Sequence, residues 1–406
     1  MNRRQFVSTG ALAAAVTSST PAIAAATPKR ALMKLGATAG GGGEDGPGRG
    51  LPPGALPDSA PEASSANSSA APTRGGRNGG RGAAANRDPE AAYKSLGRWG
   101  IKNVVGTARI ADGRLYATVD ELNQLTAMAD KYGVTVDVLN PPFLPSSHID
   151  RERHPAIMLA QSPERDRDIE QIQTMIKNCA AARIPCIKYN LSILGVLRTG
   201  RIPGRGDTTY TSYKLADAHP NPLLTKAGVV DADQYWERIT YFLNKVIPVA
   251  TEYKVRMALH PNDSPVPPAG YQGVQCVLGT VEGLKKFVTI NESPYHGLNF
   301  CQGTVSEMCQ DPGKEIPEII RYFGSRKKIF NVHFRNIRGH RDEFAEVAPD
   351  EGSVDMYKAM LAYKEAGYEY MVHPDHNVSS PSDTGGEYAA FVYGYIRALI
   401  QAVDHV

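Results

Sequence analysis

The chain has 406 residues, of which 42% are hydrophobic and 21% are charged. That length allows one large barrel or two ordinary domains, and the apolar content is sufficient for a buried core. The net charge of only +3 gives no sign of nucleic acid among the partners.

The first 26 residues have the pattern of an export signal. Arg3 and Arg4 are followed by Phe6 and by an alanine-rich, weakly apolar stretch that ends in small residues at 22–24. This pattern is typical of a twin-arginine signal peptide, although a disordered alanine-rich start is an alternative. We therefore expect a periplasmic or otherwise exported mature protein, residues 27–406. No later run is long and apolar enough to span a membrane.

A segment of low complexity interrupts the start of the expected domain. Residues 32–36 are predicted to form a short strand, and residues from about 39 to 88 are mainly Gly, Ala, Ser, Pro, Asn and Arg. Such a composition cannot bury enough apolar surface to offset chain entropy, so this insert is predicted to be disordered. A helix is expected to open at Asp88, with Pro89 in its first turn. The segment would be an N-terminal linker if 32–36 is not a strand.

Strand and helix patterns alternate from residue 102 onward. Short apolar runs predict strands at residues 102–106, 134–139, 185–190, 255–260, 298–301, 328–334 and 368–373. Helices are expected at residues 118–132, 165–182, 232–253, 281–289, 314–323, 354–366 and 387–403. With the first strand and helix these make eight β/α units, which favours a closed (β/α)8 TIM barrel. An open doubly wound sheet is the alternative.

A potential metal ligand stands at the end of four of the expected strands. The four residues are His260, Cys301, His333 and Asp375. The carboxyl ends of all barrel strands share one mouth, so these side chains can converge although the sequence separates them. Each alone has an ordinary structural explanation, but together they indicate one divalent metal. Imidazole, thiolate and carboxylate suit a transition metal, and four protein ligands with open positions favour Mn²⁺ or Fe²⁺ over closed tetrahedral zinc.

Several sequence strings resemble the mannonate dehydratase family. They lie at residues 258–263, 300–304, 332–337, 352–356 and 374–376, and include Val-His-Phe-Arg-Asn-Ile and Pro-Asp-His. The resemblance implies a TIM barrel of the xylose isomerase-like type and a hydro-lyase activity. Such an enzyme converts D-mannonate, a sugar acid, to 2-keto-3-deoxy-D-gluconate and water with Mn²⁺ or Fe²⁺, in glucuronate catabolism. It also suggests a homodimer.

The matched motifs imply roles for individual side chains. The four strand-end residues would be the metal ligands. Arg335 would hold the substrate carboxylate or a hydroxyl group through two hydrogen bonds. His376 and Tyr388 would exchange protons with the substrate, and the motifs leave open which is the acid and which the base. Further substrate contacts are expected from Lys188, Asn190, Arg198 and Arg201.

The chain departs from the family pattern near its third and fourth expected strands. Lys-Tyr-Asn-Leu-Ser-Ile at 188–193 replaces the usual Cys-Tyr-Asn-Phe-Met-Pro, and residues 140–148 lack the usual acidic segment. His373 stands where the family commonly has Arg. The metal ligands are kept while the substrate-facing loops differ, so a related aldonate is also considered as substrate. A sugar isomerase or epimerase on the same barrel is the alternative, and a non-catalytic sugar-binding protein is a third reading.

Overall fold

This computed structural model describes residues 30–39, 89–110, 113–263, 266–267, 269–376, 378–383 and 386–406. The expected signal peptide at 1–26 lies outside these ranges, and so does the expected insert apart from its first residue. Both stay predictions, as does the start of the domain at residue 27. Within the described ranges, no helix is long and apolar enough to cross a bilayer.

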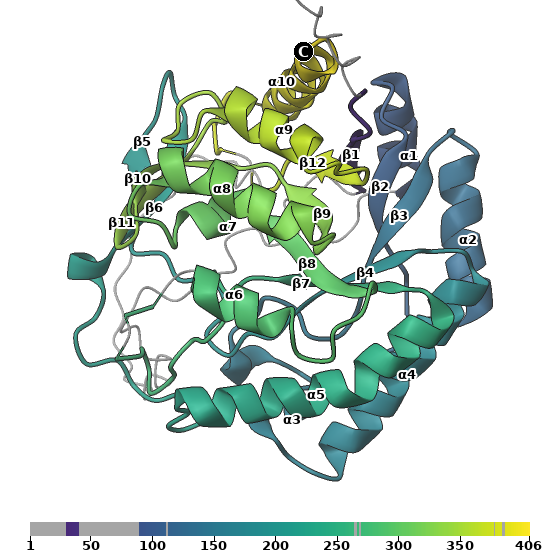
Figure 1. Ribbon diagram of the computed structural model, residues 1–406, viewed down its shortest axis with the longest axis vertical. Coiled ribbons are helices and arrows are strands. Elements are labelled where there is room, and N and C mark those ends of the chain that lie inside the picture. Colours follow the sequence, from purple (N-terminus) through teal and green to yellow (C-terminus); the bar gives the residue numbers. More distant parts are fainter. Residues whose placement is uncertain are drawn as a thin grey trace, which may run out of the picture.

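In the described part of the chain, eight parallel strands close into a barrel (Figure 1). Their order around the barrel is β1 (Lys34–Thr38), β12 (Met371–His373), β9 (Ile329–His333), β8 (His296–Cys301), β7 (Arg256–His260), β4 (Cys186–Asn190), β3 (Thr135–Asn140) and β2 (Asn103–Thr107). The first strand pairs with both the second and the last, so the sheet has no free edge. The predicted TIM barrel is confirmed, and the open sheet is excluded.

Helices surround the barrel and cover its outer face (Figure 1). The main ones are α1 (Pro89–Arg98), α2 (Val119–Asp130), α4 (Glu164–Ala181), α5 (Ala232–Tyr253), α6 (Val281–Phe287), α8 (Pro312–Ser325), α9 (Met356–Glu365) and α10 (Glu387–Asp404). Shorter turns are α3 (Ala156–Leu159), α7 (Gln302–Ser306), η1 (Ile149–Arg151) and η2 (Leu215–Asp217). All expected helices are confirmed to within a few residues at their ends. Capping boxes start two of them, at Thr118 and at Asp231.

The inside of the barrel changes from apolar to polar along its axis. Small and apolar side chains, including Cys186, Ala258 and Met371, form a buried cluster inside the barrel. Side chains alternate along a strand, so Lys188 and Asn190 share the inward face of Cys186 and lie nearer the carboxyl end. Polar and ionisable side chains therefore collect at the mouth where the active site of a TIM barrel lies.

A small antiparallel sheet beside the barrel was not predicted. Among the described residues it has the order β10 (Asn336–His340), β11 (Glu343–Val347), β6 (Thr209–Lys214) and β5 (Gly200–Pro203). These strands come from the connections that follow β9 and β4, and they lie together at one side of the molecule (Figure 1). The backbone of Thr209 also pairs with Ser379, so the sheet holds the segment that follows β12.

Candidate metal centre

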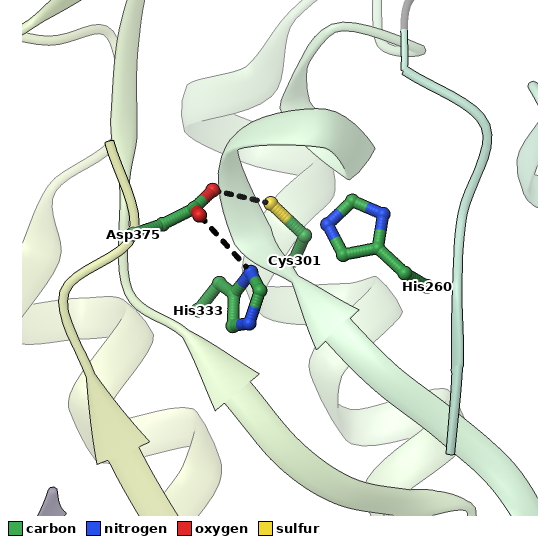
Figure 2. Close-up of side chains that lie close together, drawn as sticks. All are labelled: His260, Cys301, His333 and Asp375. Carbon is green, nitrogen blue, oxygen red and sulfur yellow. Dashed lines mark hydrogen bonds and ion pairs between the residues drawn. The ribbon is translucent and has the colours of Figure 1, made fainter. Parts of the chain in front are cut away.

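The four predicted metal ligands converge at the carboxyl ends of four neighbouring strands (Figure 2). His260, Cys301 and His333 are the last residues of β7, β8 and β9. Asp375 lies two residues beyond the end of β12. One ligand atom from each residue lies within 4.8 Å of the other three, and all four side chains are buried. The strand-end register therefore brings together residues that are spread over more than a hundred positions of the chain.

Contacts within the set point its ligand atoms at one another (Figure 2). Asp375 Oδ1 lies 3.3 Å from His333 Nδ1, and the Cys301 thiol lies 3.4 Å from Asp375 Oδ2. His260 Nδ1 is 2.7 Å from the Pro261 carbonyl oxygen. A carbonyl only accepts, so Nδ1 carries the proton and Nε2 has the lone pair that a metal needs.

The charge states of the set suit a cation. Burial alone would raise the pKa of the Cys301 thiol, but the Arg335 guanidinium lowers it to about 6. Burial also opposes ionisation of Asp375, yet His376 and His333 hold the pKa of that carboxyl well below its usual range. A thiolate, a carboxylate and two imidazoles thus share one buried pocket. This donor set fits a divalent transition metal, which would bind through His260, Cys301, His333 and Asp375.

Arg335 lies directly behind the ligands and is surrounded by carboxylates. Its Nε donates to Asp375 at 3.1 Å, Nη1 donates to Glu307 and Glu346 at 2.8 and 3.0 Å, and Nη2 donates to Asp263 at 3.0 Å. The side chain is only 3% exposed. In this arrangement the guanidinium orients Asp375, and the expected contact with a substrate would require displacement of one of the carboxylates.

Arg198 enters the same cluster from the loop after β4. It donates to Asp263 at 2.6 Å and to Glu307 at 3.4 Å, and its Nε lies 3.1 Å from Glu346. Despite burial, Arg198 keeps the pKa values of Asp263 and Glu346 below their usual range. Burial and the neighbouring Asp263 raise the pKa of Glu307 well above its usual range. The two guanidinium groups neutralise this acidic cluster, so it does not require a second cation.

His376 is a buried cationic donor beside the ligand set. Its Nδ1 lies 2.9 Å from both carboxylate oxygens of Glu346, and its Nε2 lies 3.8 Å from Asp375 Oδ1. Burial would lower the pKa of His376, but the two carboxylates raise it to about 9. The ring is therefore an imidazolium at neutral pH. Within the described residues its Nε2 has no hydrogen-bond partner.

Two of the expected substrate contacts lie on the inward face of β4. Asn190 pairs in register with His260 and helps to line a cavity of about 10 Å³, on the order of the room for one water. Lys188 is buried two residues deeper in the barrel. Asn190 thus reaches the edge of the metal centre, while Lys188 lies below it.

Two other expected site residues are not brought to the ligands. Arg201 is exposed on β5. Tyr388 lies at the start of α10, where its ring centroid is 6.0 Å from that of Phe391. Burial, followed by the nearby Tyr210, raises the pKa of Tyr388. Among the contacts of described residues, none joins Tyr388 to the ligand set, and its catalytic role stays a prediction.

Three acidic residues of the cluster were missed by the sequence analysis. Asp263 ends the string at residues 258–263, which contains the ligand His260, so its position near the metal centre could have been predicted. Glu307 follows the Cys301 ligand within an unusually buried segment at 301–309. Glu346 had no local signal, because it reaches the site through the antiparallel sheet.

Comparisons with known proteins agree with these observations. The model of the D-mannonate dehydratase (UxuA) family matches residues 221–405, a range that contains all four ligands. The mannonate dehydratase of Thermotoga petrophila is 28% identical over 350 residues, covering 75% of this chain and 91% of that protein. That of Oceanobacillus iheyensis is 27% identical over 332 residues, covering 71% and 86%.

A solved structure shares the fold. The mannonate dehydratase of Streptococcus suis serotype 2 has a TM-score of 0.65 and 22% sequence identity, covering 77% of this chain and 89% of that one. The barrel, the family match over the ligand-bearing half and the coverage of the curated relatives agree with one another. The chain is similar to mannonate dehydratases, which are hydro-lyases, over 75% of its length and over the part that carries the four metal ligands.

Proposed function

We propose that the protein removes water from D-mannonate, or from a closely related aldonate, to give a 2-keto-3-deoxy acid. Mn²⁺ or Fe²⁺ would be the metal. The observation that carries the proposal is the convergence of four metal ligands beside the His376 imidazolium, inside the range that the family model matches. The family depends on a metal, and the ligand chemistry of this chain suits one.

The reaction requires two bond changes that these groups can assist. A general base takes a proton from the carbon next to the carboxylate, the hydroxyl group on the following carbon accepts a proton and departs as water, and the resulting enol rearranges to the 2-keto acid. A divalent metal bound to this set would supply positive charge that polarises the substrate oxygens. Asp375 and Arg335, joined at 3.1 Å, fix the geometry on one side of the ligand set.

His376 is suited to protonate the departing hydroxyl. Its Nε2–H is available to a substrate oxygen, while Glu346 holds the other ring nitrogen at 2.9 Å. When the carbon–oxygen bond breaks, this proton leaves with the oxygen as water. General acid catalysis of this kind contributes roughly 10²–10⁴-fold to a rate.

The charges of the centre favour an acid over a neutral sugar. Three cations face three ionised carboxylates in the centre. The cations are Arg198, Arg335 and His376, and the carboxylates are Asp263, Glu346 and Asp375. The Cys301 thiolate adds one negative charge. A bound divalent cation would add two positive charges to this centre. A carboxylate substrate would then be attracted into a pocket of low dielectric, where charge interactions are strong.

An assay with two substrate classes tests this proposal. Protein loaded with Mn²⁺ or Fe²⁺ is incubated with D-mannonate and other aldonates, and the 2-keto-3-deoxy product is measured. Turnover of neutral ketoses without any dehydration of acids would favour the isomerase or epimerase alternative. That alternative has less support, because the family model and the curated relatives cited above are dehydratases.

We further propose that the protein is exported and forms a homodimer. The twin-arginine pattern at Arg3 and Arg4 supports export of the folded protein. Cell fractionation with a variant that carries two lysines at these positions tests the first proposal, because loss of both arginines should leave the protein in the cytoplasm. Light scattering of the purified protein tests the second.

A further inference from the structure

A row of hydrogen-bonded polar side chains crosses the inside of the barrel beneath the metal ligands. It runs from His333 at the end of β9 through Asn299 on β8 and Asn331 on β9 to His373 at the end of β12. All four side chains are fully buried. Asn299 Nδ2 is 3.2 Å from His333 Nε2, Asn331 Nδ2 contacts Asn299 Oδ1, and Asn331 Nδ2 is 3.0 Å from His373 Nε2.

The directions of the hydrogen bonds in this row follow from His373, and Asn331 Nδ2 donates to both of its neighbours. His373 Nδ1 donates to a backbone carbonyl at 2.9 Å, so its Nε2 accepts from the Asn331 amide. The same amide donates to Asn299 Oδ1, which leaves Asn299 Nδ2 as the donor to His333 Nε2. A neutral His333 that accepts at Nε2 carries its proton on Nδ1, which faces Asp375 Oδ1 at 3.3 Å.

A metal requires the other form of His333. Nδ1 is the ring nitrogen that faces the ligand set (Figure 2), so it must present a lone pair and the proton must move to Nε2. Asn299 must then offer Oδ1 instead of Nδ2, by a half turn of its amide. That turn places the Asn299 NH₂ group against the Asn331 NH₂ group. The hydrogen bonds of the row therefore disfavour the turned amide.

We propose that Asn299 is a positioning residue that selects which nitrogen of His333 carries the proton. The amide row favours the form with Nδ1–H and thereby restrains metal affinity, while the half-turned amide fixes the ring once the metal is bound. This inference rests on the metal centre of the proposed function, but it concerns metal binding and not turnover.

A carboxylate at position 299 should favour the form of His333 that carries its proton on Nε2. Asn299→Asp keeps the shape of the side chain and offers two acceptors, one to the Asn331 amide and one to His333 Nε2–H. We expect it to bind Mn²⁺ more tightly than the original chain, by about tenfold or more. Asn299→Leu offers no hydrogen bond and should bind about 10–100-fold more weakly than Asn299→Asp. Affinity is measured by competition with a chelator on metal-free protein.

Controls separate positioning from charge and from folding. Asn244→Asp adds the same charge at an exposed site on α5 and should leave the affinity unchanged. Circular dichroism and thermal unfolding of the metal-free variants show whether they fold. Weaker binding by a folded Asn299→Asp, or equal losses in the Asp and Leu variants, would overturn the proposal.

A spectroscopic measurement on the original chain covers the case in which Asn299→Asp does not fold. Nitrogen-15 NMR of labelled histidines locates the ring proton, with the His333 signal assigned from a His333→Gln variant. The proton should sit on Nδ1 in metal-free protein and on Nε2 after addition of diamagnetic Zn²⁺. A proton on Nε2 in both states contradicts the inference.

Metal binding and aldonate turnover test different proposals. Metal binding without aldonate turnover would contradict the proposed function and leave this inference in place. Absence of any divalent metal binding would contradict both.

Discussion

Glu346 holds His376 through both of its carboxylate oxygens, each 2.9 Å from His376 Nδ1. The two residues belong to different parts of the fold, because Glu346 lies on β11 of the antiparallel sheet and His376 lies just after β12 of the barrel. The small sheet therefore supplies a charge to the centre of the active site. β11 belongs to the connection that follows β9, and its pairing with β6 holds this connection, and with it Glu346, beside the barrel.

Removing the charge of Glu346 should change the pH dependence of the enzyme. In the proposed function His376 acts as an acid in its protonated form, and the neighbouring carboxylates raise the pKa of His376 to about 9. Activity should therefore be retained below that pH and fall above it. In Glu346→Gln the pKa of His376 drops, so the fall should begin at lower pH, and kcat near pH 8 should decrease by about tenfold to a hundredfold.

The control for this variant lies on the same strand. Glu343→Gln removes an equal charge from the exposed end of β11, where the carboxylate pairs with Lys214 at 3.2 Å. Glu343→Gln should leave the dependence of kcat on pH unchanged. An alkaline limb that stays in place in Glu346→Gln would show that this carboxylate does not set the charge of His376.

Loss of one metal ligand should abolish metal binding and activity but not folding. Cys301→Ala removes the thiolate, and His333→Ala removes an imidazole, so each variant keeps three of the four ligands. Metal content after dialysis, activity and circular dichroism are the measurements. Cys276→Ala, which changes a partly buried cysteine outside the ligand set, is the matched control. Full activity in His333→Ala would exclude this metal centre.

The barrel and its metal ligands could be predicted because their signals are local. Each ligand follows an apolar run of strand length, and the parallel register of β8 and β9 pairs Cys301 directly with His333. Boundaries were less accurate, since the strand expected at 368–373 is limited to Met371–His373. Pairing with β1 begins at Met371, opposite Lys34. Of the segment at 368–370, the Tyr370 carbonyl accepts a hydrogen bond from the Lys34 backbone N–H.

The antiparallel sheet could not be predicted because its pairing is remote. Tyr213 on β6 pairs with Phe344 on β11, across about 130 residues of chain, and both strands are short and rich in polar side chains. The role of Arg335 depended on the same sheet. The sequence analysis predicted that Arg335 lies at the barrel mouth. The Glu346 carboxylate, which accepts a hydrogen bond from Arg335 Nη1, lies on β11. Long-range pairing thus determined which polar groups meet at the site.

Arg198 should contribute strongly to stability, unlike its neighbour Arg201. Arg198→Met removes a buried cation from between Asp263 and Glu346, and loss of one partner of a buried ion pair costs about 3–5 kcal/mol. Arg201→Met changes an exposed side chain and should alter the free energy of unfolding by less than about 0.5 kcal/mol. Urea unfolding of both variants in metal-free form measures the difference. Equal stabilities would show that the acidic cluster does not need Arg198.

His296 should make the fold sensitive to mild acid at the opposite end of β8 from the metal. This fully buried ring lies 2.9 Å from the Phe287 carbonyl through Nε2, and burial lowers its pKa to about 4. The unfolded chain, with an ordinary histidine pKa of about 6.5, binds a proton that the folded chain excludes. Stability should therefore be complete above pH 6.5 and fall as the pH is lowered toward 4, by about 3 kcal/mol in all.

A variant without this titration isolates the effect. His296→Gln should be less stable at neutral pH, because its amide fits the buried site less well, but it should lose less further stability between pH 6.5 and 4.5. Urea unfolding of metal-free protein at several pH values provides the comparison, with the exposed His405→Gln as control. If the original chain and His296→Gln lose stability in parallel over that range, the buried ring is not the source of the acid sensitivity, because every other titrating group is common to both.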